Sequence, residues 1–234
     1  MPWSWFHNIV RRIPSRCAVC HGWPSQPVCE ACVNRFAQPC PRCRTCALPV
    51  ESGQVQCGAC IRTLPPWDCA LAAVAYDYPW SQLVVDFKFG QQPGWARSMA
   101  LLMRSAPWVE PALDAADLLV PMPLSRQRLR ERGFNQALLL ARALSPHKTQ
   151  PRLLLRIKDT PAQSSLPRAA RLTNVQNAFA TDPLRQAAIY GRRVVLVDDV
   201  MTSGASLGAA THSLRHAGAA HITTLVFARA EPGH

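Results

Sequence analysis

Residues 194–206 read VVLVDDVMTSGAS, an apolar run that ends in two adjacent acids and a short stretch of hydroxyl residues around one glycine. An apolar run of this length predicts a strand buried on both faces of a parallel sheet. Ligands of such sheets bind at the carboxyl ends of the strands. The stretch therefore predicts an α/β fold and places Asp198 and Asp199 at its binding site.

The segment after the acids has the composition of an anion site. A helix is expected to begin near its end, so backbone N–H groups, hydroxyls and the positive end of a helix dipole would surround one point. Gly204 lets the backbone approach an anion closely. The segment is best suited to a phosphate monoester, and its residues are Thr202, Ser203, Gly204, Ala205 and Ser206.

The two acids need a partner other than the phosphate, because carboxylates repel it. Sugar hydroxyls, a magnesium ion or a group that becomes cationic would serve. A phosphate beside a diol describes a 5-phosphoribosyl group. One alternative is a helix cap and surface pair with no ligand. A P-loop ATPase is excluded, because the chain's lysines, Lys88, Lys148 and Lys158, do not lie in the motif G-x-x-x-x-G-K-[ST].

The rest of the chain alternates between strand-like and helix-like segments. Strands are expected at residues 69–76, 117–120, 153–155, 193–197 and 222–228, and helices at residues 81–89, 133–144 and 205–217. This order predicts a parallel, doubly wound sheet with helices on both faces. The polar stretch 157–178 has no long apolar period and is predicted to form a lid, to which Arg156 and Arg171 contribute.

The cysteines have the spacing of metal ligands. Nine of the ten lie between residues 17 and 60, and eight form four Cys-x-x-Cys pairs. Two such pairs complete one closed four-cysteine site, so the pattern predicts two structural zinc ions. The predicted ligands are Cys17, Cys20, Cys29, Cys32, Cys43, Cys46, Cys57 and Cys60.

The cysteine pattern leaves several alternatives open. Cys40 stands at the same spacing before Cys43, so it could replace Cys46, and the sequence does not say which pairs share an ion. An iron–sulfur cluster or redox-active pairs are alternatives to zinc. The pattern stops before Leu64-Pro65-Pro66-Trp67, which predicts a cysteine-rich domain over residues 1–64 and a second domain over residues 65–234.

Positive charge is concentrated in one part of the chain. The net charge is +12, and residues 126–193 hold 12 Arg and 2 Lys against 3 acids, which gives +11 for this region. Such a region favours ligands that carry phosphate, either a small polyphosphate or a nucleic-acid backbone. No run of 18 apolar residues is present, so we expect no membrane span. We expect the protein to be cytoplasmic.

Several of these segments together resemble a known family. Residues 194–206 resemble the phosphoribosyl-pyrophosphate (PRPP) motif of type I phosphoribosyltransferases, and residues 128–141, RLRERGFNQALLLA, resemble the hallmark of the ComF family of competence-related proteins. The cysteine pairs match as well, so the resemblance covers about residues 17–229. It implies a parallel-sheet type I phosphoribosyltransferase fold with a small N-terminal cysteine-rich zinc ribbon domain. Further family-like positions are Phe87-Lys88-Phe89, Arg156, Thr160, Gln163, Arg171, Asn174 and Asn177-Ala178-Phe179.

The resemblance also implies roles for individual residues. Asp198 and Asp199 would hold the ribose 2′- and 3′-hydroxyls, one of them assisting proton transfer, and Thr202 to Ser206 would hold the 5′-phosphate. Ser203 and Ser206 stand where threonine is more usual, and the hydroxyls are kept. The turn at Met122-Pro123 matches the pyrophosphate loop. Arg126, Arg128 and Arg132 are candidates to face the diphosphate, and the predicted site includes Arg128.

The functional expectation is a ComF-type protein that binds PRPP with Mg²⁺ and is linked to DNA uptake, natural transformation or DNA utilisation. Phosphoribosyl transfer to an acceptor is a possible activity, and no sequence pattern dictates the acceptor. The alternative is a non-enzymatic adaptor or single-stranded-DNA-binding protein that uses its basic face and zinc ribbons. Competence or recombination proteins are the expected macromolecular partners.

Overall fold

The computed structural model describes residues 15–90, 92–158 and 178–231, which form two compact units divided between Gln38 and Pro39. The first unit holds helix α2 (Glu30–Phe36) and the first four cysteines. The second unit holds the second group of cysteines together with the whole sheet. The boundary between the two compact units therefore lies before the second cysteine group. The domain boundary at residues 64 and 65 remains a prediction from the cysteine pattern.

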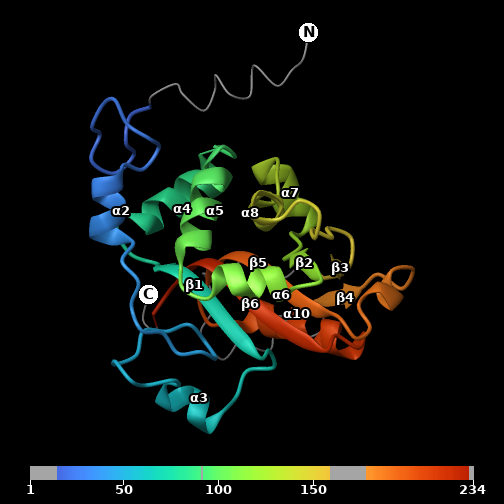
Figure 1. Ribbon diagram of the computed structural model, residues 1–234. Helices are drawn as coiled ribbons and strands as arrows, with labels where there is room; N and C mark the ends of the chain where they lie inside the picture. The colour runs from blue at the N-terminus through green and yellow to red at the C-terminus, as the bar shows by residue number, and fades with distance from the viewer. Residues whose placement is uncertain (1–14, 91, 159–177, 232–234) are drawn as a thin grey trace. The chain divides into compact units, whose positions relative to one another are not determined.

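A four-stranded parallel sheet forms the centre of the second unit (Figure 1). Its strand order is β1 (Cys69–Ala75), β6 (His221–Arg229), β5 (Arg193–Met201) and β2 (Leu118–Pro121). Residues 148–150 run parallel to β2, since the N–H of Leu119 donates to the carbonyl of Lys148 at 2.8 Å and the N–H of Gln150 to that of Leu119 at 2.8 Å. β5 is therefore a central strand, as its apolar run predicts.

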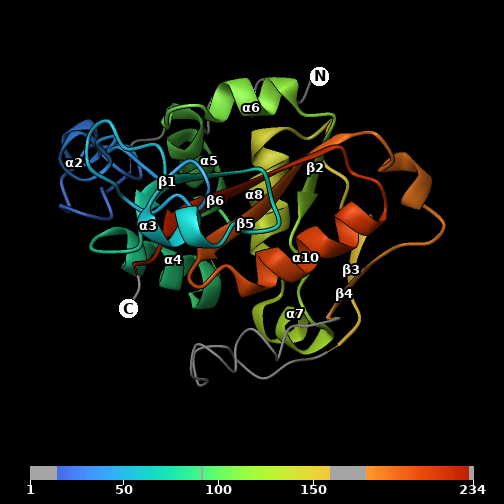
Figure 2. The same cartoon turned by 90° about the horizontal axis from the view of Figure 1, so that it is seen from below.

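Helices cover both faces of this sheet. One face carries α4 (Trp80–Phe89), α5 (Trp95–Ser105) and α8 (Gln136–Leu144), and the other face carries α10 (Ala205–His216), as Figures 1 and 2 show together. α6 (Val109–Ala115) packs against α5, and α3 (Gly58–Arg62) belongs to the second cysteine group. The expected α/β class and the parallel sheet are confirmed. In the described residues, no helix is both long and apolar enough to cross a bilayer.

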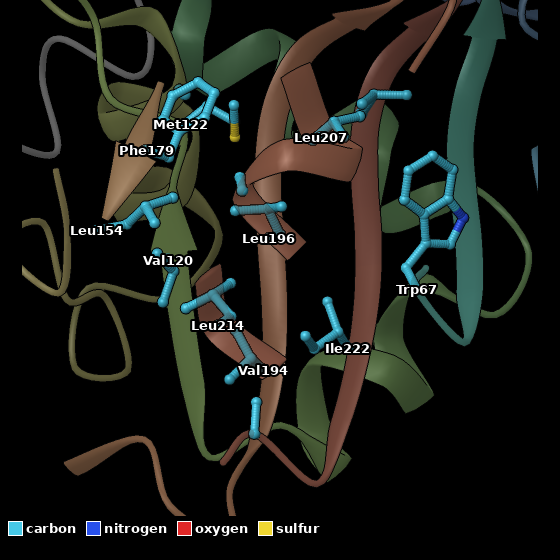
Figure 3. Close-up of a cluster of buried hydrophobic side chains, with 14 of the residues drawn as sticks. Trp67, Val120, Met122, Leu154, Phe179, Val194, Leu196, Leu207, Leu214 and Ile222 are labelled. Carbon is cyan, nitrogen blue, oxygen red and sulfur yellow. The ribbon is translucent and has the colours of Figure 1, made fainter. Parts of the chain in front are cut away.

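The core depends on strands that are apolar on both faces. On the α10 side, Val194 and Leu196 of β5 and Ile222 of β6 pack with Leu207 and Leu214 of α10 (Figure 3). On the opposite side, the rings of Trp80 and Phe227 meet edge to face, with centroids 6.0 Å apart. Burial of both faces explains why β5 reads as a continuous apolar run.

The strand expected at residues 153–155 exists but does not join the parallel sheet. β3 (Leu154–Arg156) pairs antiparallel with β4 (Phe179–Thr181) in a separate two-stranded sheet. This small sheet packs on α10, where the Ser213 hydroxyl donates to the carbonyl of Phe179 at 2.9 Å. The prediction that these residues form a fifth strand of the doubly wound sheet was therefore wrong. Their partner, β4, is a short segment whose sequence has no strand-like period, so nothing in the sequence indicated this pairing.

Five of the described α-helices lie where none was expected: α2, α3, α5, α6 and α7 (Arg126–Arg132). The expected helix over residues 133–144 begins only at Gln136, because Gly133 has a φ of 77° and is the C-cap of α7. Asn135 then begins α8 by accepting a hydrogen bond from the N–H of Leu138 at 3.1 Å. A 3-10 turn at Gln186–Ala188 precedes β5.

Candidate functional site

The two predicted acids lie within strand β5, which continues to Met201 rather than ending before them. Asp198 stands in register with Val226 of β6, and Asp199 is only 6% exposed. Lys88 of α4 pairs with Asp199, and its Nζ lies 2.9 Å from Oδ2. The sequence analysis quoted Lys88 as a family-like position and gave it no role. The structure thus places one cation against the buried Asp199, next to the partly buried Asp198.

The pair of acids holds a proton more tightly than isolated carboxylates would. Burial raises the pKa of Asp198 to about 7, and the neighbouring charge of Asp199 contributes in the same direction. The charge of Lys88 opposes this rise, as does a 2.9 Å hydrogen bond from the N–H of Asp199 to Oδ1 of Asp198. Asp198 can therefore gain or lose a proton near neutral pH.

The loop after β5 leads directly into the N-terminus of α10. Gly204 has a φ of 77°, and a Cβ at this position would lie 2.9 Å from the Trp67 ring. A glycine is needed for both reasons. The first N–H groups of α10 have no partner within the helix, so this end attracts anions. The helix expected after the predicted phosphate loop is present and begins at Ala205.

The wall opposite this loop comes from α7, α8 and the turn before them. Asn135 donates to the carbonyl of Met122 at 3.0 Å, which fixes the turn at Met122 and Pro123. The guanidinium of Arg132 lies over the ring of Phe89, 4.9 Å from its centroid, and donates to Gln136 at 3.2 Å. This wall therefore presents arginine side chains toward the acids of β5.

One cavity of about 600 Å³ contains nearly all of the predicted ligand residues. Ser203 is the exception, since it is outside the lining and its hydroxyl accepts from the N–H of Ala205 at 3.4 Å. Of the three candidate arginines, Arg128 and Arg132 line the cavity and Arg126 does not. The predicted residues that line it are Asp198, Asp199, Thr202, Gly204, Ala205, Ser206, Met122, Pro123 and Arg128.

The cavity also contains residues that the sequence analysis gave no role. Lys88, Phe89 and Tyr76 come from the ends of α4 and β1 and bring one more cation and two aromatic rings. A larger cavity of about 830 Å³ lies elsewhere in the second unit and includes Cys69, Arg193 and His221, at the amino ends of their strands. Its lining includes the predicted metal ligand Cys43 but none of the residues predicted to bind PRPP, so the smaller cavity is the candidate PRPP site. The predicted lid lies mostly within residues 159–177, outside the described residues.

The cysteines gather into two groups of four, with all their sulfurs within 4.8 Å of one another in each group. The groups are Cys17, Cys20, Cys29 and Cys32, and Cys43, Cys46, Cys57 and Cys60. Cys40 is exposed and lies outside both, and every cysteine is a free thiol. The structure thus settles the pairing left open by the sequence: the first two Cys-x-x-Cys pairs meet, and so do the last two.

The sulfur distances fit a tetrahedral zinc ion. Sulfurs about 2.3 Å from a tetrahedral ion are separated by about 3.8 Å, and the Cys20–Cys29 and Cys46–Cys57 sulfurs are each 3.6 Å apart. Burial alone raises the pKa of Cys17, yet N–H donors from residues 20, 29 and 19 outweigh it and lower that pKa to about 6. Backbone donors likewise lower the pKa of Cys43 to about 7. Each group can therefore hold zinc as a structural ion.

Comparison with known proteins agrees with this architecture. Residues 140–233 match the phosphoribosyl transferase domain. The chain is 33% identical over 226 residues to "Competence protein F" of Haemophilus influenzae, covering 92% of this chain and 97% of that protein. It is 29% identical over 201 residues to "DNA utilization protein YhgH" of Salmonella typhimurium, covering 83% and 87%. It is 36% identical over 117 residues to "Competence protein ComFC" of Bacillus subtilis, covering 50% and 46%.

Fold, cavity and cysteine groups define the class of protein: a type I phosphoribosyltransferase fold preceded by cysteine ribbons that can hold zinc. The similarity to Competence protein F extends over nearly the whole of both chains. The chain belongs to the ComF family.

The grouping of the cysteines predicts metal content. The purified protein should contain two zinc ions per chain by mass spectrometry, and Cys43→Ser should reduce this to about one, because a closed site needs all four thiolates. Cys40→Ser is the matched control from the same segment and should keep two. Loss of zinc in the Cys40→Ser protein, or a folded wild-type protein without zinc, would contradict the assignment.

Proposed function

We propose that this protein binds PRPP with Mg²⁺ in the 600 Å³ cavity. The observation that carries the proposal is the placement of an acid pair, a helix N-terminus and three arginines, Arg128, Arg132 and Arg156, around one cavity. The loop from Thr202 to Ser206 would hold the 5′-phosphate, and Asp198 with Asp199 would hold the ribose hydroxyls. Arg128 and Arg132 would face the diphosphate. Each charged part of the ligand then meets groups of opposite charge or hydrogen-bond donors.

The acid pair is suited to a ligand that brings positive charge or hydroxyl donors. Lys88 neutralises one of its two charges, which leaves one carboxylate free to accept from a hydroxyl or from water on a metal ion. Mg²⁺ would neutralise the diphosphate as it leaves the ribose. The protein's own contribution is to orient the ribose and exclude water, and Asp198 can accept a proton near neutral pH. These are the requirements of phosphoribosyl transfer.

We also propose a role in DNA uptake or DNA utilisation, supported by the relatives named for competence and DNA utilisation. A second candidate activity is the binding of single-stranded DNA, and the observation that favours it is the net charge of +11 over residues 126–193. Arg130 and Arg152 of this region are exposed and lie outside the cavity. The two activities use different residues and can be separated.

Replacement of the acids should weaken PRPP binding. Asp198→Asn or Asp199→Asn should raise the dissociation constant about ten- to a hundredfold, since hydrogen bonds to a charged group contribute about 1.5–3 kcal/mol each. Titration calorimetry with Mg²⁺ and PRPP gives the measurement. Asp86→Asn, on the same helix as Lys88, is the control and should bind like the wild type. Absence of binding heat in the wild type would refute the ligand assignment.

Binding should also depend on pH through Asp198. The ionised carboxylate is the form that accepts from ribose hydroxyls, so affinity should rise from pH 6 to pH 8 with a midpoint near 7. Lys88→Met should move this midpoint upward, because the lysine charge lowers the pKa of Asp198. Affinities are measured by calorimetry across this pH range for the wild type and for Asp198→Asn. The pH dependence of the Asp198→Asn protein gives the contribution from titration of PRPP itself, which is subtracted. A midpoint unchanged by Lys88→Met would contradict the role of the ion pair.

The affinity for single-stranded DNA should depend on the exposed arginines and not on the acid pair. Arg130→Gln with Arg152→Gln should weaken binding of a labelled oligonucleotide and lower its salt dependence by about 1.4 in log–log slope, while PRPP affinity stays the same. Fluorescence anisotropy at several salt concentrations measures both. Asp199→Asn should leave DNA binding intact. If DNA binding were lost with the acids instead, the basic region would not be the DNA-binding surface.

A further inference from the structure

Arg229 connects the second cysteine group to the loop of the proposed phosphate site. It is the last residue of β6, it is 6% exposed, and it lies in register with Met201 of β5. Its Nε donates to the carbonyl of Cys46 at 2.7 Å. Its Nη1 donates to the carbonyls of Met201 at 3.0 Å and Thr202 at 2.6 Å, and also to that of Ala230. One buried guanidinium thus joins a metal-ligating residue to the start of the loop.

Trp67 makes a second connection between the same two regions. Its indole N–H donates to the carbonyl of Thr45 at 2.6 Å, and Thr45 lies between Cys43 and Cys46. Its ring lies against Gly204, where an added Cβ would be 2.9 Å away, and against Gly208 on the next turn of α10. Trp67 is 7% exposed and belongs to the same core as Leu207, and Figure 3 shows it beside β1 and β6.

Both connections end on neighbouring carbonyls of a single Cys-x-x-Cys turn. Thr45 is itself held from the other half of the group, since Gln56 donates to its hydroxyl at 2.6 Å. The position of these carbonyls therefore depends on the four cysteines being held together. A bound ion fixes such turns, which otherwise have little apolar core to stabilise them.

We propose that Arg229 and Trp67 are positioning residues through which metal binding by the second cysteine group orders the phosphate-binding loop. This inference rests on the proposed binding of PRPP. It assigns to the second group a function that the first group does not share: support of residues 201–204 beneath the anion site. Loss of the ion would release the carbonyls of Thr45 and Cys46, and the two side chains that contact the loop would each lose a fixed acceptor.

Variants of the two positioning residues test the link without changing a metal ligand. Arg229→Lys keeps a cation but cannot reach several carbonyls at once, and Trp67→Phe removes the indole N–H and the ring that meets Gly204. Each should raise the PRPP dissociation constant about tenfold or more while zinc stays at two ions per chain. Arg215→Lys is the matched control, because Arg215 also donates to two backbone carbonyls, those of Ala219 and Ala220, away from the loop.

Metal ligands from the two groups provide a second comparison. Cys29 and Cys57 each cap the first turn of a helix, and each belongs to a different group. Cys29→Ser and Cys57→Ser should each lose about one zinc ion. Only Cys57→Ser should show faster hydrogen exchange of the amides in residues 201–206, measured without PRPP. Hydrogen exchange is measured without PRPP, so it tests the link between the cysteine group and the loop by itself. Failure of the proposed function would instead appear as absence of PRPP binding in the wild type.

A reciprocal measurement completes the test. If the ion and PRPP stabilise the same loop arrangement, PRPP with Mg²⁺ must slow release of one of the two zinc ions to a chelator, and Arg229→Lys must abolish this effect. The proposal is overturned if Arg229→Lys and Trp67→Phe bind PRPP like the wild type. Equal effects of Cys29→Ser and Cys57→Ser on exchange in the loop would overturn it as well.

Discussion

The desolvation of two adjacent carboxyl groups at the end of β5 is the constraint to which the rest of the site responds. A buried pair of like charges is unfavourable unless cations or protons compensate it. Lys88 of α4 pairs with Asp199, and Asp198 retains a proton up to about neutral pH. Lys88 of α4 and the arginines Arg128 and Arg132 of α7 bring positive charge to this edge of the sheet. The ligand proposed above would offer hydroxyls to the acids and phosphates to the basic side chains.

Much of this could be predicted from local sequence. The β5 run, the acids and the start of α10 lie within 13 consecutive residues, so periodicity and composition are sufficient to place them. The pairing of Lys88 with Asp199 could not be predicted, because it depends on how α4 crosses the sheet. The same holds for β4, whose few residues have no period. Helix α5 was predictable, since its buried residues Ala96, Met99, Ala100 and Met103 follow the helical spacing.

The spacing of the cysteines in the sequence predicts which residues can bind a metal ion, but it does not predict which residues surround each group. Both read as paired Cys-x-x-Cys motifs, and in both one thiol receives backbone N–H donors. Their settings differ, since the first lies in the small unit and the second in the unit that contains the sheet. Arg229 and Trp67 connect the second group to the core, and neither residue stands near a motif that would reveal it. A buried arginine at the end of an apolar strand is evident only in three dimensions.

The contacts of the second group determine where the chain can be shortened. Removal of residues before Pro39 would leave Thr45 and Cys46 in place. Removal of everything before Pro65 would take away Thr45 and Cys46, so the Trp67 indole and the buried Arg229 guanidinium would each lose an acceptor. Unsatisfied buried donors of this kind are costly, most of all when charged. A fragment that begins at Pro65, designed from the cysteine pattern alone, would therefore start with a defect beside the loop that follows β5.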